Sequence, residues 1–105
     1  MLPVALLQHH PGTVCIGEVR RLLDKRSIPH RTFRADIGEL PGNDDVSGLV
    51  LCGSDYYLKD IRNEEWVVRE LDLLSSTNRP VLGICFGLQL VAEAFGGLTA
   101  KGEGY

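Results

Sequence analysis

A cysteine between two glycines, in the run Gly83-Ile84-Cys85-Phe86-Gly87, constrains the fold of this chain more than any other segment. An apolar run precedes it, and a stretch of helical character follows it. A nucleophile at the apex of a sharp strand-to-helix turn has a strained backbone, and side chains two residues before and after it would collide. Glycine at both places relieves the collision. The pattern therefore predicts a nucleophile elbow with Cys85 at its apex, where the dipole of the following helix favours the thiolate.

A buried cysteine is the competing interpretation of Cys85, because free cysteine is among the most buried residue types and packs as a small apolar side chain. In that case Gly83 and Gly87 would only allow a strand and a helix to pack closely. The two glycines at this spacing, after an apolar strand and before a helix, favour the nucleophile.

Short apolar runs alternate with amphipathic stretches along the chain. We expect strands over residues 4–8, 30–34, 46–52 and 81–84, and helices over 15–25, 64–74 and 86–95. Asn63 is the expected N-cap of the second helix, Gly96-Gly97 the end of the third, and Leu98 to Ala100 the start of a further strand. This order predicts an α/β fold, an open and mostly parallel sheet with helices on both faces.

Ligands of such sheets bind beyond the carboxyl ends of the strands, where His9-His10, Cys52-Gly53-Ser54 and Cys85 are expected. An acyl-transfer site also needs amide donors directed at the developing oxyanion. The amide of Phe86, at the start of a helix, is one candidate. A turn at Gly53 would supply a second, because glycine allows a substrate to approach the backbone closely. A plain turn glycine remains the alternative at Gly53.

Composition excludes several classes of protein. The net charge is −3, with 44% hydrophobic and 24% charged residues, as in ordinary soluble globular proteins. Basic residues form no extended patch for nucleic acid or for an anionic membrane, and no apolar run has transmembrane length. Cys15, Cys52 and Cys85 are widely spaced without a C-x-x-C pair, so we expect no disulfide framework and no metal site, and a reducing cytoplasm as the location.

Three segments carry a family resemblance. Residues 80–90, with Gly96-Gly97 after them, resemble the nucleophile segment of class I glutamine amidotransferases. Residues 7–9 with Gly12 resemble the first strand and loop of stand-alone amidotransferase-like proteins related to the glutaminase domain of GMP synthase. Residues 48–53, followed by Asp60 and Trp66, resemble their oxyanion strand and the loop after it. The resemblance covers the whole chain, and it implies a flavodoxin-like fold in which residues 1–105 form the N-terminal part of one class I glutamine amidotransferase-like domain, truncated after the nucleophile.

The resemblance also implies a chemistry. Cys85 would attack the side-chain amide of glutamine or of a related γ-glutamyl substrate, and water would resolve the thioester without a metal or an organic cofactor. Gly53 and Phe86 would hold the oxyanion, and Gln89 would help to bind the substrate. For Gln89, an ordinary polar residue on a helix surface is the alternative. The implied partners are the small-molecule substrate and a synthase domain or subunit that uses the ammonia.

The chain departs from the family pattern in two places. The family commonly has Gly-Gly-Pro where this chain has Cys52-Gly53-Ser54, which puts the shape of the oxyanion loop in doubt. The family's catalytic His and Glu lie far downstream of the nucleophile, and no histidine follows His30 in this sequence. We therefore expect little or no turnover from residues 1–105 alone. We also expect the incomplete sheet to self-associate as dimers or aggregates.

Three further alternatives stay open. His9 or His10 lies at the correct edge of the sheet to replace the missing base, although a histidine there is more often a loop or packing residue. A PfpI-like cysteine hydrolase would share the sheet, but that group usually has His directly after its nucleophile, where this chain has Phe86. A catalytically inactive amidotransferase-like binding or regulatory module is the third, and the absent base favours it.

Overall fold

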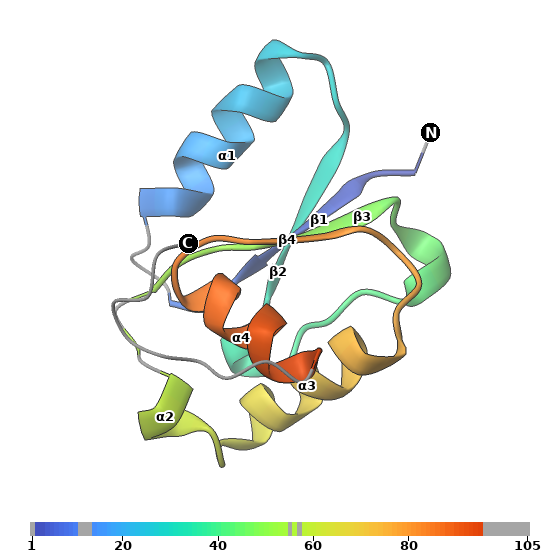
Figure 1. Ribbon diagram of the computed structural model, residues 1–105. Helices are drawn as coiled ribbons and strands as arrows, with labels where there is room; N and C mark the ends of the chain where they lie inside the picture. The colour runs from blue at the N-terminus through green and yellow to red at the C-terminus, as the bar shows by residue number, and fades with distance from the viewer. Residues whose placement is uncertain (1, 11–13, 55, 57, 96–105) are drawn as a thin grey trace.

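The computed structural model describes residues 2–10, 14–54, 56 and 58–95. Four strands form one parallel sheet in the order β2-β1-β3-β4 (Figure 1). They are β1 (Val4–Gln8), β2 (His30–Arg34), β3 (Gly48–Leu51) and β4 (Val81–Gly83). Val4 aligns with His30 on one side and with Gly48 on the other, and Leu51 aligns with Gly83. The parallel sheet expected from the sequence is confirmed.

Helices cover both faces of this sheet, as expected. Figure 1 shows α1 (Val14–Lys25) on one side, with α3 (Glu65–Ser76) and α4 (Phe86–Ala94) on the other. The short α2 (Leu58–Ile61) lies near the start of α3. Two single turns of 3₁₀-helix, Ala35–Ile37 and Asn43–Asp45, interrupt the polar connection between β2 and β3.

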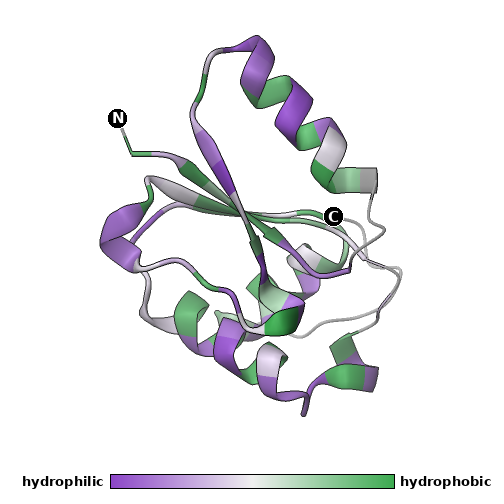
Figure 2. Cartoon of the chain, turned by 180° about the vertical axis from the view of Figure 1, so that it is seen from behind, coloured by the Kyte–Doolittle hydropathy of each residue, from purple (hydrophilic) through white to green (hydrophobic). Residues whose placement is uncertain are grey.

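Alternation along β1 divides the core between the two faces, because successive side chains of a strand point to opposite sides. Ala5 and Leu7 belong to the larger cluster, which includes residues of α3 and α4. Leu6 packs with Ile16 of α1 and with Cys52 on the opposite face. Figure 2 shows β1 and β3 as apolar strands at the centre of the molecule and β2 as a largely hydrophilic one. β1 is thus the buried strand that its continuous apolar run predicts.

Some boundaries differ from those expected. The third strand spans only Gly48–Leu51, and α2 was not expected. The prediction of Asn63 as the N-cap of α3 is wrong, because the amide of Glu64 still bonds to Ile61 in the turn that ends α2. Glu64 is the N-cap, and its carbonyl accepts from Val68 at 3.0 Å. The expected helix end at 96–97 and strand at 98–100 lie outside the described residues.

The strand order has a reversal between β1 and β3, since the chain passes from β1 outward to β2 and then returns to the other side of β1. In open α/β sheets the crevice at such a reversal, beyond the carboxyl ends of the strands, is where ligands bind. His9 follows β1 at this place and Cys52-Gly53 follow β3, while Cys85 follows the neighbouring β4. The fold therefore collects the residues singled out in the sequence at one edge.

Candidate functional site

Cys85 forms the corner between β4 and α4. Its backbone has φ 52° and ψ −110°, a conformation that residues with side chains rarely adopt and that costs about 1–3 kcal/mol. Its carbonyl accepts hydrogen bonds from the amides of Leu88 and Gln89, which start the helix. The residue is exposed, so the interpretation of Cys85 as a buried apolar side chain is wrong. The thiol is presented at the surface of the carboxyl edge.

The two flanking glycines allow this corner to form. A Cβ atom added to Gly83 would lie 2.5 Å from the carbonyl oxygen of Gly87. A Cβ atom on Gly87 would overlap the carbonyl oxygen of Leu51 in β3. At both glycines the strand, the corner and the helix therefore contact one another through backbone atoms alone. A side chain at either position would collide, as the glycine spacing predicts.

Gly53 lies against the nucleophile from the neighbouring strand. A Cβ atom on Gly53 would be 3.2 Å from Cβ of Cys85 and 3.8 Å from its Sγ. Phe86, the first residue of α4, is buried with 1% exposure. Within the part of the chain that the structure describes, neither the Gly53 amide nor the Phe86 amide donates to another backbone group. The assignment of these two amides as oxyanion donors stays a prediction.

Gln89 lies one turn into α4 and has a partner of its own. Its side-chain Oε1 accepts a hydrogen bond of 2.8 Å from the amide of Leu58, at the start of α2. This bond ties the segment after β3 to the nucleophile helix. The observed contact is structural, and the role of Gln89 in substrate binding stays a prediction.

His9 and Glu70 form a buried pair that the sequence analysis missed. Both side chains are 0% exposed, and Nε2 of His9 lies 2.6 Å from Oε2 of Glu70 in α3. Nδ1 of His9 lies 2.7 Å from the carbonyl oxygen of Cys52. Both ring nitrogens are therefore engaged away from Cys85, which argues against His9 as a substitute base. One signal was present: Glu70 falls on the same helical stripe as the core residues Val67 and Leu74.

Aromatic rings pack around this pair. The His9 ring stacks on Trp66 with centroids 6.0 Å apart and meets the edge of Phe86 at 5.1 Å. Tyr56 adjoins both Trp66 and Phe86, at 6.1 and 6.2 Å, and its ring also meets His10 at 5.7 Å. The loops after β1 and β3 are thereby packed against α3 and the start of α4.

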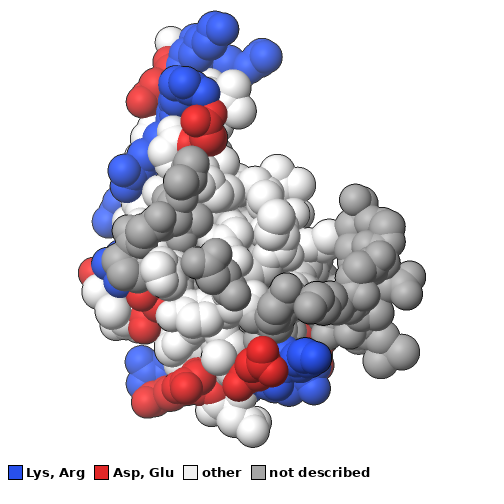
Figure 3. Space-filling model, turned by 90° about the vertical axis from the view of Figure 1, so that its left-hand side faces the viewer, with Lys and Arg blue, Asp and Glu red and all other residues white. Residues whose placement is uncertain are grey.

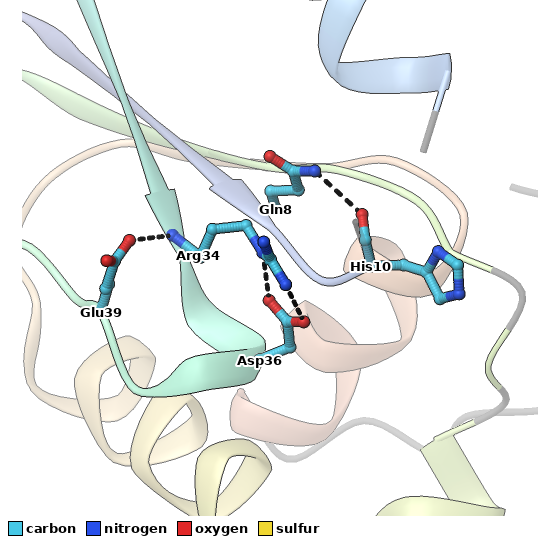
Figure 4. A network of polar contacts seen from close by, with 5 residues as sticks. All are labelled: Gln8, His10, Arg34, Asp36 and Glu39. Carbon is cyan, nitrogen blue, oxygen red and sulfur yellow. Dashed lines mark hydrogen bonds and ion pairs between the residues drawn. The ribbon is translucent and has the colours of Figure 1, made fainter. Parts of the chain in front are cut away.

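Polar contacts gather at the neighbouring ends of β1 and β2 (Figure 4). Arg34 donates two hydrogen bonds to the carboxylate of Asp36, at 2.8 and 2.7 Å, and its amide donates to Glu39 at 2.9 Å. The hydrogen bonds from Arg34 hold the pKa of Asp36 below its ordinary value. Gln8 donates to the carbonyl of His10 at 2.9 Å, and Figure 4 shows the His10 ring pointing away from the Arg34 group. The Arg34 contacts thus connect the end of β2 to the turn that follows it.

The three cysteines have different surroundings. Burial, and secondarily Cys15, raises the pKa of the Cys52 thiol to about 12, so Cys52 is a neutral thiol near pH 7. Cys85 alone of the three is exposed, and Cys15 is half-buried. Among the described residues, no three His, Cys, Asp or Glu side chains are grouped to hold a metal ion. No helix in the described part is long and apolar enough to cross a membrane.

Charge is concentrated away from the middle of the face seen in Figure 3. Lys and Arg side chains gather along α1 with acidic residues among them, and the white central area between α1 and the charges below carries none. The basic residues of α1 are thus mixed with acidic ones such as Glu18, which pairs with Arg21. This surface has no large patch of one sign.

These observations define a class: an open parallel α/β protein with a strained, exposed cysteine at a strand-to-helix corner on its carboxyl edge. The comparison with protein families agrees with this class. The model described as Glutamine amidotransferase class-I matches residues 18–105. The chain therefore belongs to the class I glutamine amidotransferase family.

Two curated relatives illustrate the relationship. Gamma-glutamyl peptidase 4 of Arabidopsis thaliana is 37% identical over 76 residues, which are 67% of this chain and 30% of that protein. One of the subunits of the glutamine-hydrolyzing GMP synthase of Methanococcus aeolicus is 33% identical over 81 residues, 77% of this chain and 38% of that protein. The chain thus spans about a third of the length of these relatives.

Solved structures agree on the fold. A glutamine amido transferase from Methylobacillus flagellatus superposes with a TM-score of 0.73 at 31% identity, over 91% of this chain and 40% of that one. A glutamine amidotransferase from Thermotoga maritima gives a TM-score of 0.73 at 20% identity, over 90% of this chain and 43% of that one, and shows the fold alone. The flavodoxin-like fold of class I amidotransferases, expected from the sequence, is confirmed.

Proposed function

We propose that this chain is the nucleophile-bearing part of a thiol amidohydrolase that acts on the side-chain amide of glutamine or of a γ-glutamyl compound. The observation that carries the proposal is the strained and exposed Cys85, which lies against Gly53 with two unused backbone amides beside it. Gly83 and Gly87 permit that geometry, because a Cβ atom at either position would collide with neighbouring backbone.

In the proposed reaction the Cys85 thiolate attacks the amide carbon, and the carbonyl oxygen becomes an oxyanion. The amides of Gly53 and Phe86 donate to this oxygen, and each donor of this kind contributes about 10²–10³ in rate. The C–N bond then breaks, ammonia or an amine leaves with a proton, and water hydrolyses the γ-glutamyl thioester. In the family a His and a Glu downstream of the nucleophile move these protons, and residues 1–105 contain no histidine after His30.

The names of the relatives suggest the substrate and the setting. One is a γ-glutamyl peptidase and another belongs to a glutamine-hydrolyzing GMP synthase. Both names indicate a γ-glutamyl carbonyl as the reacting group, so we propose glutamine or a γ-glutamyl peptide as the substrate, and cytoplasm as the location. A synthase subunit that takes up ammonia is the partner that the second relative suggests. No metal or organic cofactor takes part in the proposed chemistry.

A second candidate function is a binding module that holds a γ-glutamyl group without cleaving it. The engagement of His9 with Cys52 and Glu70 favours this candidate for residues 1–105, because it leaves that histidine unable to take a proton from Cys85. Binding and nucleophilic attack would both take place at the Cys85 corner. An affinity label distinguishes the two functions, because it reacts with a nucleophilic Cys85 and not with an inert thiol.

The experiment is to incubate the chain with a diazo-ketone analogue of glutamine and to map the modified residue by mass spectrometry. The label reacts as R-CO-CHN₂ with the thiol: an S–C bond forms at the diazo carbon, which takes up the proton, and N₂ leaves. We expect modification at Cys85, with Cys15 and Cys52 left unmodified. Slow labelling of Cys52 and Cys85 at equal rates would refute the proposed nucleophile.

A further inference from the structure

We propose that His9 and Glu70 are positioning residues, which fix the direction of the Gly53 amide and so prepare one of the two oxyanion donors. The inference rests on the proposed function, because it assigns that amide to the oxyanion. Its basis is one continuous chain of buried contacts from Glu70 in α3, through the His9 ring, to the carbonyl of Cys52.

One peptide unit joins the His9 contact to the proposed oxyanion donor, the unit between Cys52 and Gly53. The carbonyl oxygen of Cys52 and the N–H of Gly53 belong to one planar trans peptide and point in opposite directions. The oxygen is turned toward the buried His9 ring, 2.7 Å from Nδ1. The N–H of Gly53 is therefore turned away from that ring. The His9 contact sets the orientation of the amide that borders Cys85.

The hydrogen bond to Cys52 determines which ring nitrogen of His9 carries a proton. A carbonyl oxygen only accepts, so Nδ1 of His9 must carry a hydrogen. The 2.6 Å contact between Nε2 and Oε2 of Glu70 then shares one proton, either as imidazolium and carboxylate or as imidazole and carboxylic acid. In both forms Nδ1 donates to Cys52. Without Glu70 the ring loses the carboxyl that holds Nε2, and it is free to turn out of line with the carbonyl of Cys52.

The His9 ring also contacts two aromatic side chains. His9 packs edge-on against Phe86, whose amide is the other proposed donor, and stacks on Trp66. A single buried ring thus contacts both arms of the oxyanion site. Oε1 of Glu70 has no hydrogen-bond partner among the described residues, although it is buried. A buried carboxyl with an unsatisfied oxygen is costly, and a purely apolar core would not need it.

The test uses the length of the replacing side chain. Asn at position 9 places its amide nitrogen near the site of Nδ1, where it can still donate to Cys52. Gln at position 9 places the same group near the site of Nε2, where it reaches Glu70 and loses Cys52. His9→Asn and His9→Gln therefore separate the two contacts of His9 with matched chemistry. Glu70→Gln keeps a partner for Nε2, and Glu70→Ala removes it.

The matched control is His30, which forms a second histidine–carboxylate pair with Asp24 at 2.7 Å. This pair joins β2 to α1 at the surface and touches none of the site residues. The readout is the ratio of two labelling rates at Cys85, with the diazo-ketone analogue of glutamine and with iodoacetamide. The first reagent places a carbonyl beside the oxyanion donors, and the second does not depend on them. Thermal melts show the temperature at which every variant is folded.

We expect His9→Gln and Glu70→Ala to lower the rate ratio about tenfold or more, as for a misdirected oxyanion donor. His9→Asn, Glu70→Gln and His30→Gln should keep it within about threefold of the wild type. A change in stability alone would alter both labelling rates together and leave the ratio unchanged. If folded His9→Gln retains the wild-type ratio, the positioning role is overturned while the proposed function stands. A wild-type chain that shows no preference for the glutamine analogue overturns both.

Discussion

Cys85 combines a backbone conformation that works against stability with an exposed side chain. Its φ of 52° is one of two positive values found in non-glycine residues of the described chain, the other being Ser27 after α1. Strain of this kind costs about 1–3 kcal/mol and persists where the surrounding structure imposes it. The neighbouring Gly83, Gly87 and Leu51 supply that constraint through backbone contacts. The neighbours of Cys85 thus impose a backbone conformation that a cysteine would not adopt by its own φ/ψ preference.

Replacing Cys85 with glycine should therefore raise the free energy of unfolding by about 1 kcal/mol, because glycine adopts positive φ without a steric cost. Cys85→Ala keeps the Cβ atom and should give no such gain. Urea denaturation of both variants measures the difference. A glycine variant no more stable than the alanine variant would show that the corner is not strained.

Cys52 is the natural comparison for Cys85 within the same chain. Burial raises the pKa of its thiol to about 12, whereas an ordinary thiol titrates near 8.5. We expect iodoacetamide to modify Cys85 far faster than Cys52 at every pH from 7 to about 10, as peptide mapping will show.

The raised pKa of Cys52 also predicts a pH dependence of stability. The folded state binds the thiol proton of Cys52 more tightly than the unfolded state does, so the free energy of unfolding should decline as the pH rises from about 8.5 toward 12. Cys52→Ala should reduce that decline.

At the scale of elements, β4, the corner and α4 act as one unit that packs against β3. The amide of Ile84 bonds to the carbonyl of Leu51 at 2.9 Å, and Gly87 lies against the same carbonyl. The short β4 therefore depends on close backbone approach more than on side-chain burial, since Leu82 is 59% exposed. A side chain at either glycine would separate these elements.

Gly87→Ala should lower the free energy of unfolding by about 1–3 kcal/mol, the usual range for overpacking, and should also slow labelling of Cys85. Gly17 in α1 is the matched control, because a Cβ atom there meets nothing within 4 Å. Gly17→Ala should instead stabilise the chain by about 0.5–1 kcal/mol through helix propensity. Denaturant midpoints of the two variants that shift in the same direction would contradict this assignment.

Local pattern was sufficient to predict most of these elements and only part of the site. Residues 4–8 and 30–34 were predicted as strands at their observed boundaries. A continuous apolar run marks the first, and alternation after Pro29 marks the second. The four-residue α2 and the N-cap at Glu64 depend on a turn without a distinct sequence signal. The contact of His9 with Glu70 joins residues 61 positions apart, so no local pattern contains it. The role predicted for Gln89 stays open for the same reason, because a long-range partner occupies its oxygen.

At the scale of the whole molecule, the described sheet leaves β4 with a neighbour on one side only. A hollow of about 320 Å³ lies against β3 and β4, and Val4, Val50 and Leu82 are among its lining residues. The gamma-glutamyl peptidase, the GMP synthase subunit and the Methylobacillus structure described above are two to three times as long as this chain, so they contain further structure beyond the matched part. An open strand edge with exposed apolar side chains is a liability for association.

Residues 1–105 should therefore self-associate in a concentration-dependent way, which analytical ultracentrifugation measures. Leu82→Lys should weaken the association by placing a charge on the open edge. Leu22→Lys changes a residue of α1 that is 56% exposed and lies outside β4, and it should leave the association unchanged. A chain that stays monomeric at high concentration would contradict the prediction.

We propose that Cys85 is a nucleophile in a site shaped for a γ-glutamyl amide. The most direct test measures the rate at which the diazo-ketone analogue labels Cys85 in the presence of competing ligands. The rate at Cys85 should saturate with the concentration of the label and fall when excess L-glutamine is added, but not when asparagine is added. Cys52 should remain unmodified throughout. Labelling that rises linearly with reagent, ignores L-glutamine and modifies Cys52 and Cys85 equally would contradict the claim.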